Sequence, residues 1–480
     1  MKQTKIVASV SDLRCEKSFI QELFDAGMNV VRMNTAHATK EGLKKIIHNT
    51  RAVSSHIALM IDTKGPEVRT TYTESPIIFF TDEKVKIMDN PQIETTHDEI
   101  NVSYTGFVKD LSIGNQVLFD DGELAMQVID KNDDYLLVKV LNDGRLGSNK
   151  SVNAPGVHIS LPALTEKDKQ NILLAIEEDI DFIAHSFVRS KEDIKAVQDI
   201  LDEHNSDIKI ISKIENQEGV DNIDQIIQSS YGIMIARGDL GIEVPIERIP
   251  GIQRKIIHKC VQARRPVIVA TQMLHTMINN PRPTRAEVTD IANAIYYRTD
   301  ALMLSGETAS GKYPIEAVKT MASIAEQAEK DKLKENDIKI QPSIDADVTE
   351  FLAKTAIEAT KKLNVKGIIT DCYSGRTARN LASFRGPEPV LAICYKEKLQ
   401  RWLSLSYGII PIYKHDEIDI QSCFSAALRM LKQKGYVNLD DKIAYLSGSM
   451  GEGNGTTYLD INLVSDLFNK KGLLHLPQLK

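Results

Sequence analysis

The chain has 480 residues, which is more than one ordinary domain holds, so we expect two to four domains. Its composition, 42% hydrophobic and 26% charged residues, is typical of a soluble globular protein. A net charge of −7 argues against a general nucleic-acid binder, which usually presents a basic surface. We therefore expect no nucleic-acid partner, although local basic clusters remain compatible with small anionic substrates.

The cysteines and the first residues indicate a cellular compartment. The five cysteines are scattered and form no Cys-x-x-Cys pair: Cys15, Cys260, Cys372, Cys394 and Cys423. Such a set favours buried thiols in a reducing environment over disulfides or a zinc site. The opening segment MKQTKIVASVSDLRCEK has no apolar stretch long enough for a signal peptide or a membrane span. We expect a cytoplasmic protein without a membrane partner.

One pattern recurs along the first two thirds of the chain. A short apolar run is followed by polar residues and then by a stretch of helical period. The runs are KIVASV, NVVRMN, IALMIDTK, DFIAHSF, IKIISKIEN, GIMIARGDL, PVIVATQM and DALMLSGET. Strands that alternate with helical patterns indicate parallel β/α units, and eight such units close a (β/α)₈ TIM barrel. The predicted fold class is therefore α/β.

Polar residues stand at the ends of seven of these predicted strands. They are Arg32, Asn34, Asp62, Thr63, Ser186, Lys213, Glu215, Arg237, Asp239, Thr271, Gln272, Ser305 and Glu307. A single polar tip is explained well enough by a strand leaving the core. Complementary charges on several tips favour a common site instead, because the C-terminal rim of this barrel carries the chemistry.

The spacing between predicted strands is uneven in one place. The third ends near Lys64 and the fourth begins near Asp181, with short alternating runs (KVKIMD, QVLFDDGEL, YLLVKVL) between them. We interpret residues 69–161 as an inserted small β-barrel domain that acts as a lid. The catalytic barrel then comprises residues 1–68 and 162–338. A new α/β rhythm (VKGIITDCY, PVLAICY, GIIPIY, KIAYLSG) predicts a C-terminal regulatory domain over residues 339–480.

The charges at the strand ends suit phosphoryl transfer. Glu215 and Asp239 are hard oxygen donors that fit a magnesium ion shared with a phosphate. Lys213 and Arg32 can neutralise oxyanion charge, and the segment ARGDLG can present backbone amides at the start of a short helix. Phosphoryl transfer needs metal and cations around the transferred group and little covalent work by the protein.

Other conspicuous residues have structural explanations. No Ser-His-Asp or Cys-His arrangement stands out, and we interpret His37 and His185 as packing or hydrogen-bonding residues. In the segment PRPTRAE, Thr284 and Glu287 form the pattern of a capping box that opens a helix. An added role of this segment in subunit contact stays open.

Nine segments resemble the signatures of the pyruvate kinase family, in the family's order and over essentially the whole chain. They are MNVVRMN, IDTKGPEVRT, DDGEL, LPALTEKD, ISKIENQEGV, GIMIARGDLG, VIVATQML, PRPTRAE and LMLSGETA. The resemblance implies a phosphotransferase of glycolysis that passes a phosphoryl group from phosphoenolpyruvate to ADP, giving pyruvate and ATP. It also implies the barrel, lid and C-terminal domain, assembled as a homotetramer.

The resemblance implies a role for individual positions. The catalytic residues would be Lys213, Arg32 and Thr271. The substrate-binding residues would be Arg32, Ala236, Arg237, Gly238, Asp239, Thr271, Gln272, Ser305 and Glu307. The nucleotide would be bound by Arg69, Lys150, Asn34 and His37. Mg²⁺ would be held by Glu215 and Asp239, and K⁺ by Asn34, Asp62 and Thr63.

The chain departs from the family pattern in three places. SVSDLRC lacks a Gly-Pro turn, and YRTD at 297–300 replaces a turn with glycine; we expect both to alter loop shape only. Ala36 stands where the family has serine, which removes one oxygen ligand of K⁺. We therefore expect K⁺ activation with weakened affinity, since Glu67 occupies the position that accompanies K⁺ dependence.

The C-terminal domain carries a candidate effector turn at Ser374, Gly375, Arg376 and Thr377, which in the family binds phosphorylated effectors. A glycine-rich loop, GSMGEGNGTT, would complete the site, but it contains Glu452, and Tyr373 stands where some fructose-bisphosphate-regulated members have lysine. We therefore expect a monophosphorylated effector, such as a sugar monophosphate or AMP. The alternative is that both segments are plain turns.

Two rival interpretations remain. A magnesium-dependent aldolase or lyase barrel would share the strand ends, but the inserted domain and DTKGPEVRT argue against it. A catalytically silent paralogue that only binds phosphorylated metabolites would have no need of Lys213, Glu215, Asp239 and Thr271. Equilibrium binding without turnover would distinguish that paralogue from an enzyme.

Overall fold

The structure is a computed structural model that describes residues 2–36, 38–332, 338, 340, 348–413, 420–448 and 455–470. Its contacts divide the chain into two units. The first comprises Met1–Ile61, Glu178–Phe182 and Ile257–Lys480, and the second comprises Asp62–Glu177 and Ile183–Ile256. Among the described residues, no helix is both long and apolar enough to cross a membrane.

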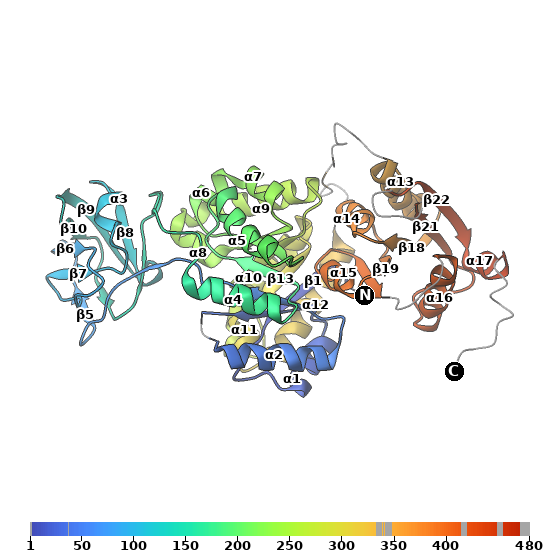
Figure 1. The fold of residues 1–480 in the computed structure, drawn as a ribbon, viewed down its shortest axis with the longest axis horizontal. Helices are drawn as coiled ribbons and strands as arrows, with labels where there is room; N and C mark the ends of the chain where they lie inside the picture. The colour runs from blue at the N-terminus through green and yellow to red at the C-terminus, as the bar shows by residue number, and fades with distance from the viewer. Residues whose placement is uncertain are drawn as a thin grey trace. The chain divides into compact units, whose positions relative to one another are not determined.

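The predicted eight strands form a closed parallel barrel (Figure 1). Their bounds are β1 (Lys5–Ser9), β2 (Val30–Asn34), β3 (Ala58–Asp62), β13 (Phe182–His185), β14 (Lys209–Ile214), β15 (Gly232–Ala236), β16 (Val267–Ala270) and β17 (Ala301–Leu304). The order around the barrel is β1-β17-β16-β15-β14-β13-β3-β2. Almost every strand residue is buried, as expected when both faces of a parallel sheet are covered. The (β/α)₈ prediction is confirmed.

Helices follow the barrel strands. They are α1 (Lys17–Asp25), α2 (Lys40–Val53), α4 (Glu166–Glu177), α5 (Lys191–Glu203), α6 (Gln217–Asp221), α7 (Ile223–Ser229), α8 (Arg237–Glu243), α9 (Ile249–Gln262), α10 (Arg285–Tyr296), α11 (Gly306–Ala309) and α12 (Pro314–Asp331). The capping box expected at Thr284 and Glu287 is present at the start of α10. A second capping box, between Ser190 and Asp193, opens α5.

The segment between β3 and α4 is a β domain, as predicted. A seven-stranded sheet has the order β4-β12-β8-β9-β10-β6-β7, and β11 pairs with β5. The bounds are β4 (Val68–Arg69), β5 (Ile77–Phe79), β6 (Lys84–Met88), β7 (Glu99–Asn101), β8 (Gln116–Phe119), β9 (Leu124–Lys131), β10 (Leu136–Val140), β11 (Gly144–Leu146) and β12 (Ser151–Asn153), with one short helix, α3 (Phe107–Asp110). Alternate residues of β9 and β10 are buried in one hydrophobic cluster, which explains the period-two pattern of the sequence.

The C-terminal part is an α/β domain with a five-stranded sheet of order β20-β19-β18-β21-β22. Its elements are β18 (Val365–Cys372), β19 (Val390–Cys394), β20 (Ile409–Tyr413), β21 (Lys442–Ser447) and β22 (Tyr458–Leu463), with α13 (Val348–Lys362), α14 (Arg376–Ser383), α15 (Glu397–Leu403), α16 (Ile420–Gln433) and α17 (Val464–Lys470). All strand pairs are parallel except β21 with β22. Two hydrophobic clusters pack helices against this sheet: α13 to α15 in one, α16 and α17 in the other.

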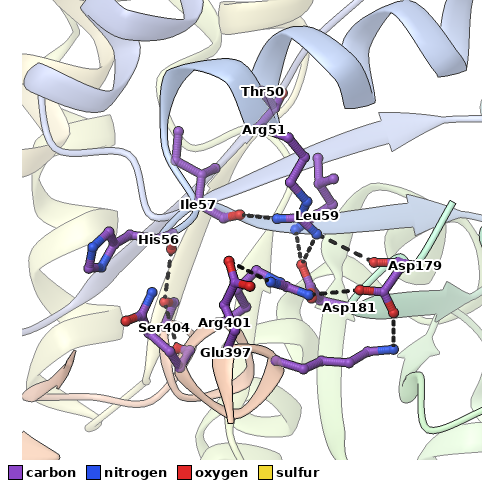
Figure 2. Close-up of polar contacts among 12 residues, drawn as sticks. Thr50, Arg51, His56, Ile57, Leu59, Asp179, Asp181, Glu397, Arg401 and Ser404 are labelled. Atoms are coloured by element: carbon purple, nitrogen blue, oxygen red, sulfur yellow. Dashed lines mark hydrogen bonds and ion pairs between the residues drawn. The ribbon is translucent and has the colours of Figure 1, made fainter. Parts of the chain in front are cut away.

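A network of ion pairs, in which Arg401 and Asp181 are buried and Asp179 is exposed, joins α15 to the start of β13 within the first unit (Figure 2). The Arg401 side chain donates through Nε to Asp181 Oδ1 at 2.6 Å and through Nη2 to Asp179 Oδ2 at 2.9 Å. Asp181 Oδ2 accepts from Arg51 Nη2 of α2 at 3.0 Å and from the Leu59 amide of β3 at 2.8 Å. One carboxylate therefore connects three barrel elements with the C-terminal domain.

Candidate active site

The end of β14 places a nearly buried cation among oxygen atoms. Lys213 Nζ donates to Ser186 Oγ at 2.8 Å and to Asp62 Oδ1 at 3.1 Å, and it lies 3.0 Å from Glu215 Oε1. The Lys213 side chain is 11% exposed, whereas those of Asp62 and Glu215 are 1% and 0% exposed. Neighbouring parallel strands bring their carboxyl ends to one edge, which is why β3, β13 and β14 supply these groups. All four residues belong to the second unit.

Two carboxyl groups beside Lys213 have raised pKa values. Burial raises the pKa of Glu215 to about 7; nearby Lys213 opposes this shift and nearby Asp239 adds to it. Burial likewise raises the pKa of Asp239, again against the effect of Lys213. The Phe187 amide donates to Glu215 Oε2 at 2.7 Å, whereas the buried Oε1 faces Lys213 Nζ at 3.0 Å. One lysine thus leaves this carboxylate pair only partly neutralised.

The pair is suited to a divalent cation. Buried carboxylates whose pKa values are raised gain most from additional positive charge. Within the part of the chain that the structure describes, no group of three or more His, Cys, Asp or Glu residues forms a closed metal site. Two carboxylates alone leave coordination positions for water and for a substrate oxygen, which is how proteins usually bind Mg²⁺.

The segment ARGDLG forms the predicted short helix. Ala236 ends β15, and α8 begins at Arg237, so Gly238 and Asp239 lie in its first turn. Arg237 Nη1 lies 3.5 Å from Gln253 Oε1 of α9. The two carboxylates of the candidate metal site therefore come from different elements. Asp239 comes from the first turn of α8, and Glu215 comes from the end of β14.

Thr63, in the second unit, accepts through its carbonyl from Ser186 Oγ at 2.7 Å, and the remaining predicted strand-end residues belong to the first unit. Arg32, on β2, donates through Nη1 to Ser9 Oγ at 3.1 Å, and Asn34 Oδ1 accepts from the Ala36 amide at 3.0 Å. Glu307 is buried and holds two backbone amides: Oε2 accepts from Ser305 at 2.7 Å and Oε1 from Leu274 at 3.1 Å. His37 lies outside the described residues.

Thr271 and Gln272 follow β16 in an uncommon backbone conformation. Their φ angles are +70° and +52°, in the left-handed region that a β-branched residue such as threonine rarely adopts. Thr271 Oγ1 donates to the carbonyl of Ala270 at 2.6 Å. Backbone strain from left-handed φ angles is concentrated at functional sites. No pattern in the sequence predicts this conformation at Thr271 and Gln272.

The inserted domain faces a cleft of about 710 Å³ within the second unit. Residues that line it include Arg69, Asp121, Asn153, Asp239 and Glu243. Asn153 Nδ2, on β12, donates to Glu243 Oε1, on α8, at 3.1 Å. The volume lies in the range of small-molecule sites, and the cleft includes one carboxylate of the candidate metal site.

The two basic residues predicted to contact a nucleotide are both paired with acids. Arg69 donates through Nε to Glu67 Oε2 at 2.7 Å and through Nη1 to the Asn149 carbonyl at 2.7 Å. Lys150 Nζ lies 2.6 Å from Asp120 Oδ2. Both basic side chains are more than a third exposed, so these pairs exchange with solvent and ligands at small cost.

The candidate effector residues form the turn between β18 and α14. Gly375 has a φ of +76°, and a Cβ atom there would lie 2.8 Å from Arg379 Nη1, so only glycine fits without a shift. Thr377 Oγ1 lies 2.8 Å from Thr456 Oγ1, beside the end of the glycine-rich loop. Residues 449–454 of that loop, with Glu452, lie outside the described residues.

Together, the closed barrel, the inserted β domain and the C-terminal α/β domain define a three-part (β/α)₈-barrel protein with a lysine and two carboxylates at its strand ends. Two family patterns match the chain: "Pyruvate kinase, barrel domain" over residues 1–318 and "Pyruvate kinase, alpha/beta domain" over residues 350–461. The chain belongs to the pyruvate kinase family.

Individual relatives agree. The chain is 50% identical to a pyruvate kinase of Borreliella burgdorferi over 477 residues, covering 98% of this chain and 99% of the relative. It is 40% identical to one of Bacillus licheniformis over 482 residues, covering 98% and 82%. A crystal structure of a pyruvate kinase from Cryptosporidium parvum superposes with a TM-score of 0.90 at 34% identity and 96% coverage of both chains. These matches weigh against the aldolase or lyase interpretation.

Proposed function

We propose that this chain transfers the phosphoryl group of phosphoenolpyruvate to ADP, giving pyruvate and ATP, as a cytoplasmic enzyme of glycolysis. One observation carries the proposal: Lys213 Nζ stands among Asp62, Ser186 and Glu215 at the end of β14, beside a second raised-pKa carboxylate. A preorganised cation in a nearly dry site stabilises the charge of a transferring phosphoryl group more strongly than water does.

The chain's own residues divide the work. Glu215 and Asp239 would hold Mg²⁺, which when bound supplies positive charge to the phosphoryl oxygens. Lys213 stabilises the group in transit and the enolate left behind, and Arg32 contacts the phosphate. Substrate positions are completed by Ala236, Arg237, Gly238, Thr271, Gln272, Ser305 and Glu307. Thr271, which has a strained backbone, would present its hydroxyl to the carbon that is protonated.

The nucleotide is bound with the help of the inserted domain. Arg69 and Lys150 contact the phosphates of ADP after leaving Glu67 and Asp120, and Asn34 and His37 contribute from the barrel. We infer that this domain closes as a lid, with Asn153 and Glu243 among the groups that meet across the cleft. Closure would exclude water from the phosphoryl group and so limit hydrolysis.

A monovalent cation completes the proposal. Asn34, Asp62 and Thr63 are the oxygen donors for K⁺, and Ala36 supplies no hydroxyl, so water fills the remaining position. Affinity for K⁺ is then weaker than with serine at residue 36. The C-terminal turn from Ser374 to Thr377 binds a monophosphorylated effector, and the chain assembles as a homotetramer.

The reaction is tested by a lactate-dehydrogenase-coupled assay with phosphoenolpyruvate, ADP, Mg²⁺ and K⁺. Formation of pyruvate that requires all three of the phosphoryl donor, ADP and Mg²⁺ is the expected result. The alternative, a silent paralogue, predicts that phosphoenolpyruvate binds at equilibrium and that no pyruvate forms. Binding without turnover would therefore overturn the proposed function.

A further inference from the structure

Two connections of the chain join the inserted domain to the barrel, and both lie within the second unit. The first connection comprises residues 63–67, from the end of β3 to the start of β4. The second comprises residues 154–165, from the end of β12 to the start of α4. Any rotation of the inserted domain against the barrel changes the backbone of these two segments. The side chains that bind the two connections therefore determine the orientation of the domain.

Arg189 binds the backbone of the second connection. Its Nη1 donates to the Ile159 carbonyl and its Nη2 donates to the Leu161 carbonyl, each at 2.9 Å. Asp193, on α5, fixes the same guanidinium group: Nε lies 3.2 Å from Oδ2, and Nη2 lies 3.0 Å from Oδ1. The planar fork of an arginine can serve several acceptors at once, which the single ammonium group of a lysine does less well.

The ion pair between Arg189 and Asp193 is largely shielded from water. The two side chains are 17% and 10% exposed. Burial acts to raise the pKa of Asp193, but hydrogen bonds from Arg189 and its charge outweigh that effect and hold the pKa below its usual value. Hydrogen bonds from a charged donor contribute more than neutral ones. Releasing the second connection from Arg189 is therefore costly.

Asp168, on α4, binds the first connection and is fully buried. Its Oδ1 accepts from the Lys64 amide at 2.9 Å and from the Gly65 amide at 3.5 Å. Its Oδ2 accepts from the hydroxyl of Thr165, the last residue of the second connection, at 2.6 Å. Gly65 has a φ of +72°, and a Cβ atom there would lie 2.7 Å from Cδ2 of Phe187, so only glycine fits without a shift. One carboxylate thus contacts both connections.

Arg189 follows closely on a residue of the candidate active site. The Ser186 hydroxyl accepts from Lys213 Nζ at 2.8 Å and donates to the Thr63 carbonyl, in the first connection, at 2.7 Å. Residues 186–189 therefore contact the catalytic lysine and both connections from one short stretch of backbone. The position of the inserted domain is in this way referred to the reacting centre.

We propose that Arg189 is a positioning residue for the nucleotide, in addition to the residues named above. By binding the second connection it would keep the inserted domain in the orientation that brings Arg69 and Lys150 to the phosphates of ADP. This role presupposes the proposed function, in which the inserted domain closes as a lid. Arg189 borders the cleft, but its guanidinium group binds backbone carbonyls and Asp193, so it acts through the connection. A looser domain spends less time in the competent orientation, and the apparent affinity for ADP falls in proportion.

The kinetic test compares Arg189→Lys with the parent in the lactate-dehydrogenase-coupled assay. The variant keeps the charge beside Asp193 but gives up the forked contact with two carbonyls. Its KM for ADP should rise roughly tenfold, the effect of losing one hydrogen bond from a charged donor. Its KM for phosphoenolpyruvate should stay within about twofold of the parent, whereas a mere loss of folded protein would lower kcat and leave both KM values unchanged. Lys191→Met, at a side chain that is 58% exposed, is the matched control and should behave like the parent.

Hydrogen exchange provides a readout that does not depend on turnover. In ligand-free Arg189→Lys, the amides of residues 154–165 should exchange faster than in the parent. Those of β9 and β10, in the core of the inserted domain, should keep the parent's rates. Unchanged exchange over residues 154–165, an unchanged KM for ADP, or an equal rise in both KM values would overturn the proposal. A parent that forms no pyruvate would refute the proposed function instead, and the exchange rates would then decide whether Arg189 holds the connection.

Discussion

Lys213 Nζ lies 3.0 Å from Oε1 of Glu215, and the two residues follow one another at an interval of two at the end of β14. Glu215 is fully buried, and its pKa is raised to about 7 because the effect of burial outweighs the attraction of the lysine. Lys213 therefore supplies positive charge to the site without fully neutralising Glu215. The Glu215 carboxylate can still bind a second cation. This relationship motivates the first prediction.

Mg²⁺ binding should depend on pH through Glu215. A proton competes with the metal below a pKa of about 7, so apparent Mg²⁺ affinity should fall roughly tenfold per pH unit in that range. The raised pKa also means that, without metal, this carboxyl favours the folded state below pH about 4.5 and loses that contribution as pH rises through about 7. Added Mg²⁺ should accordingly stabilise the protein more at pH 8 than at pH 6. Calorimetric titration and thermal midpoints at both pH values measure the two effects.

Removing either carboxylate should raise the Mg²⁺ requirement of turnover sharply. Glu215→Gln and Asp239→Asn each delete one of two anionic ligands while preserving size. Asp224→Asn, an exposed position on α7, is the matched control and should titrate like the parent. The measurement is the Mg²⁺ dependence of turnover in the coupled assay. If both site variants require the same Mg²⁺ concentration as the parent, Glu215 and Asp239 do not bind the metal.

His185 should make the protein sensitive to acid. Burial lowers its pKa to about 4, Lys213 lowers it further, and Asp193 and Asp168 oppose the shift. A depressed histidine pKa contributes stability above its unfolded value near 6.5 that is lost as pH falls toward 4, in total on the order of 3 kcal/mol. His185→Leu should therefore flatten the decline of the urea midpoint between pH 6.5 and 4. His204→Gln, at an exposed histidine, should retain the parent's decline.

The basic residues in the network of Figure 2 should contribute unequally to the free energy of unfolding. Arg401 is 5% exposed and Asp181 0%, so Arg401→Met leaves a buried carboxylate short of one partner and should cost about 3–5 kcal/mol. Lys398 pairs with Asp179, which is 65% exposed, so Lys398→Met should cost about 0–1 kcal/mol. Denaturant midpoints of the two variants provide the comparison, and equal losses would contradict the assigned burial.

K⁺ activation should respond to one hydroxyl group. Ala36→Ser restores an oxygen at the position where the family has serine, and it should lower the K⁺ concentration for half-maximal activity. Ala38→Ser, two residues further on, provides the control and should leave that midpoint unchanged. If activity ignores K⁺ in both parent and variant, the monovalent site does not operate in this chain.

The sequence predicted the parts of this structure that depend on local pattern. Eight apolar runs with polar ends correspond to the eight barrel strands, and Thr284 with Glu287 forms the expected capping box. Contacts between residues that are distant in the sequence could not be predicted in this way. Arg401 and Asp181 are 220 residues apart in the sequence, and no local pattern near either residue indicates that they form an ion pair.

The sequence also did not predict unusual backbone conformations. Thr271 and Arg264 adopt left-handed φ angles although neither residue type favours them, because the surrounding fold and side-chain contacts impose them. The sequence predicted only part of the role of Ser186. It placed Ser186 at the end of a strand, and the structure adds that its hydroxyl oxygen lies 2.8 Å from Lys213 Nζ.

The central claim, that Lys213 carries phosphoryl transfer, is tested most directly by the turnover number of Lys213→Met with saturating phosphoenolpyruvate, ADP and Mg²⁺. Lys209→Met, at the beginning of the same strand β14, serves as the matched control. Loss of a preorganised charge at the reacting centre should lower turnover on the order of a hundredfold or more, with the circular dichroism spectrum and the Lys209→Met rate unchanged. Turnover of the folded Lys213→Met protein within roughly threefold of the parent, far short of the expected loss, would contradict the assignment.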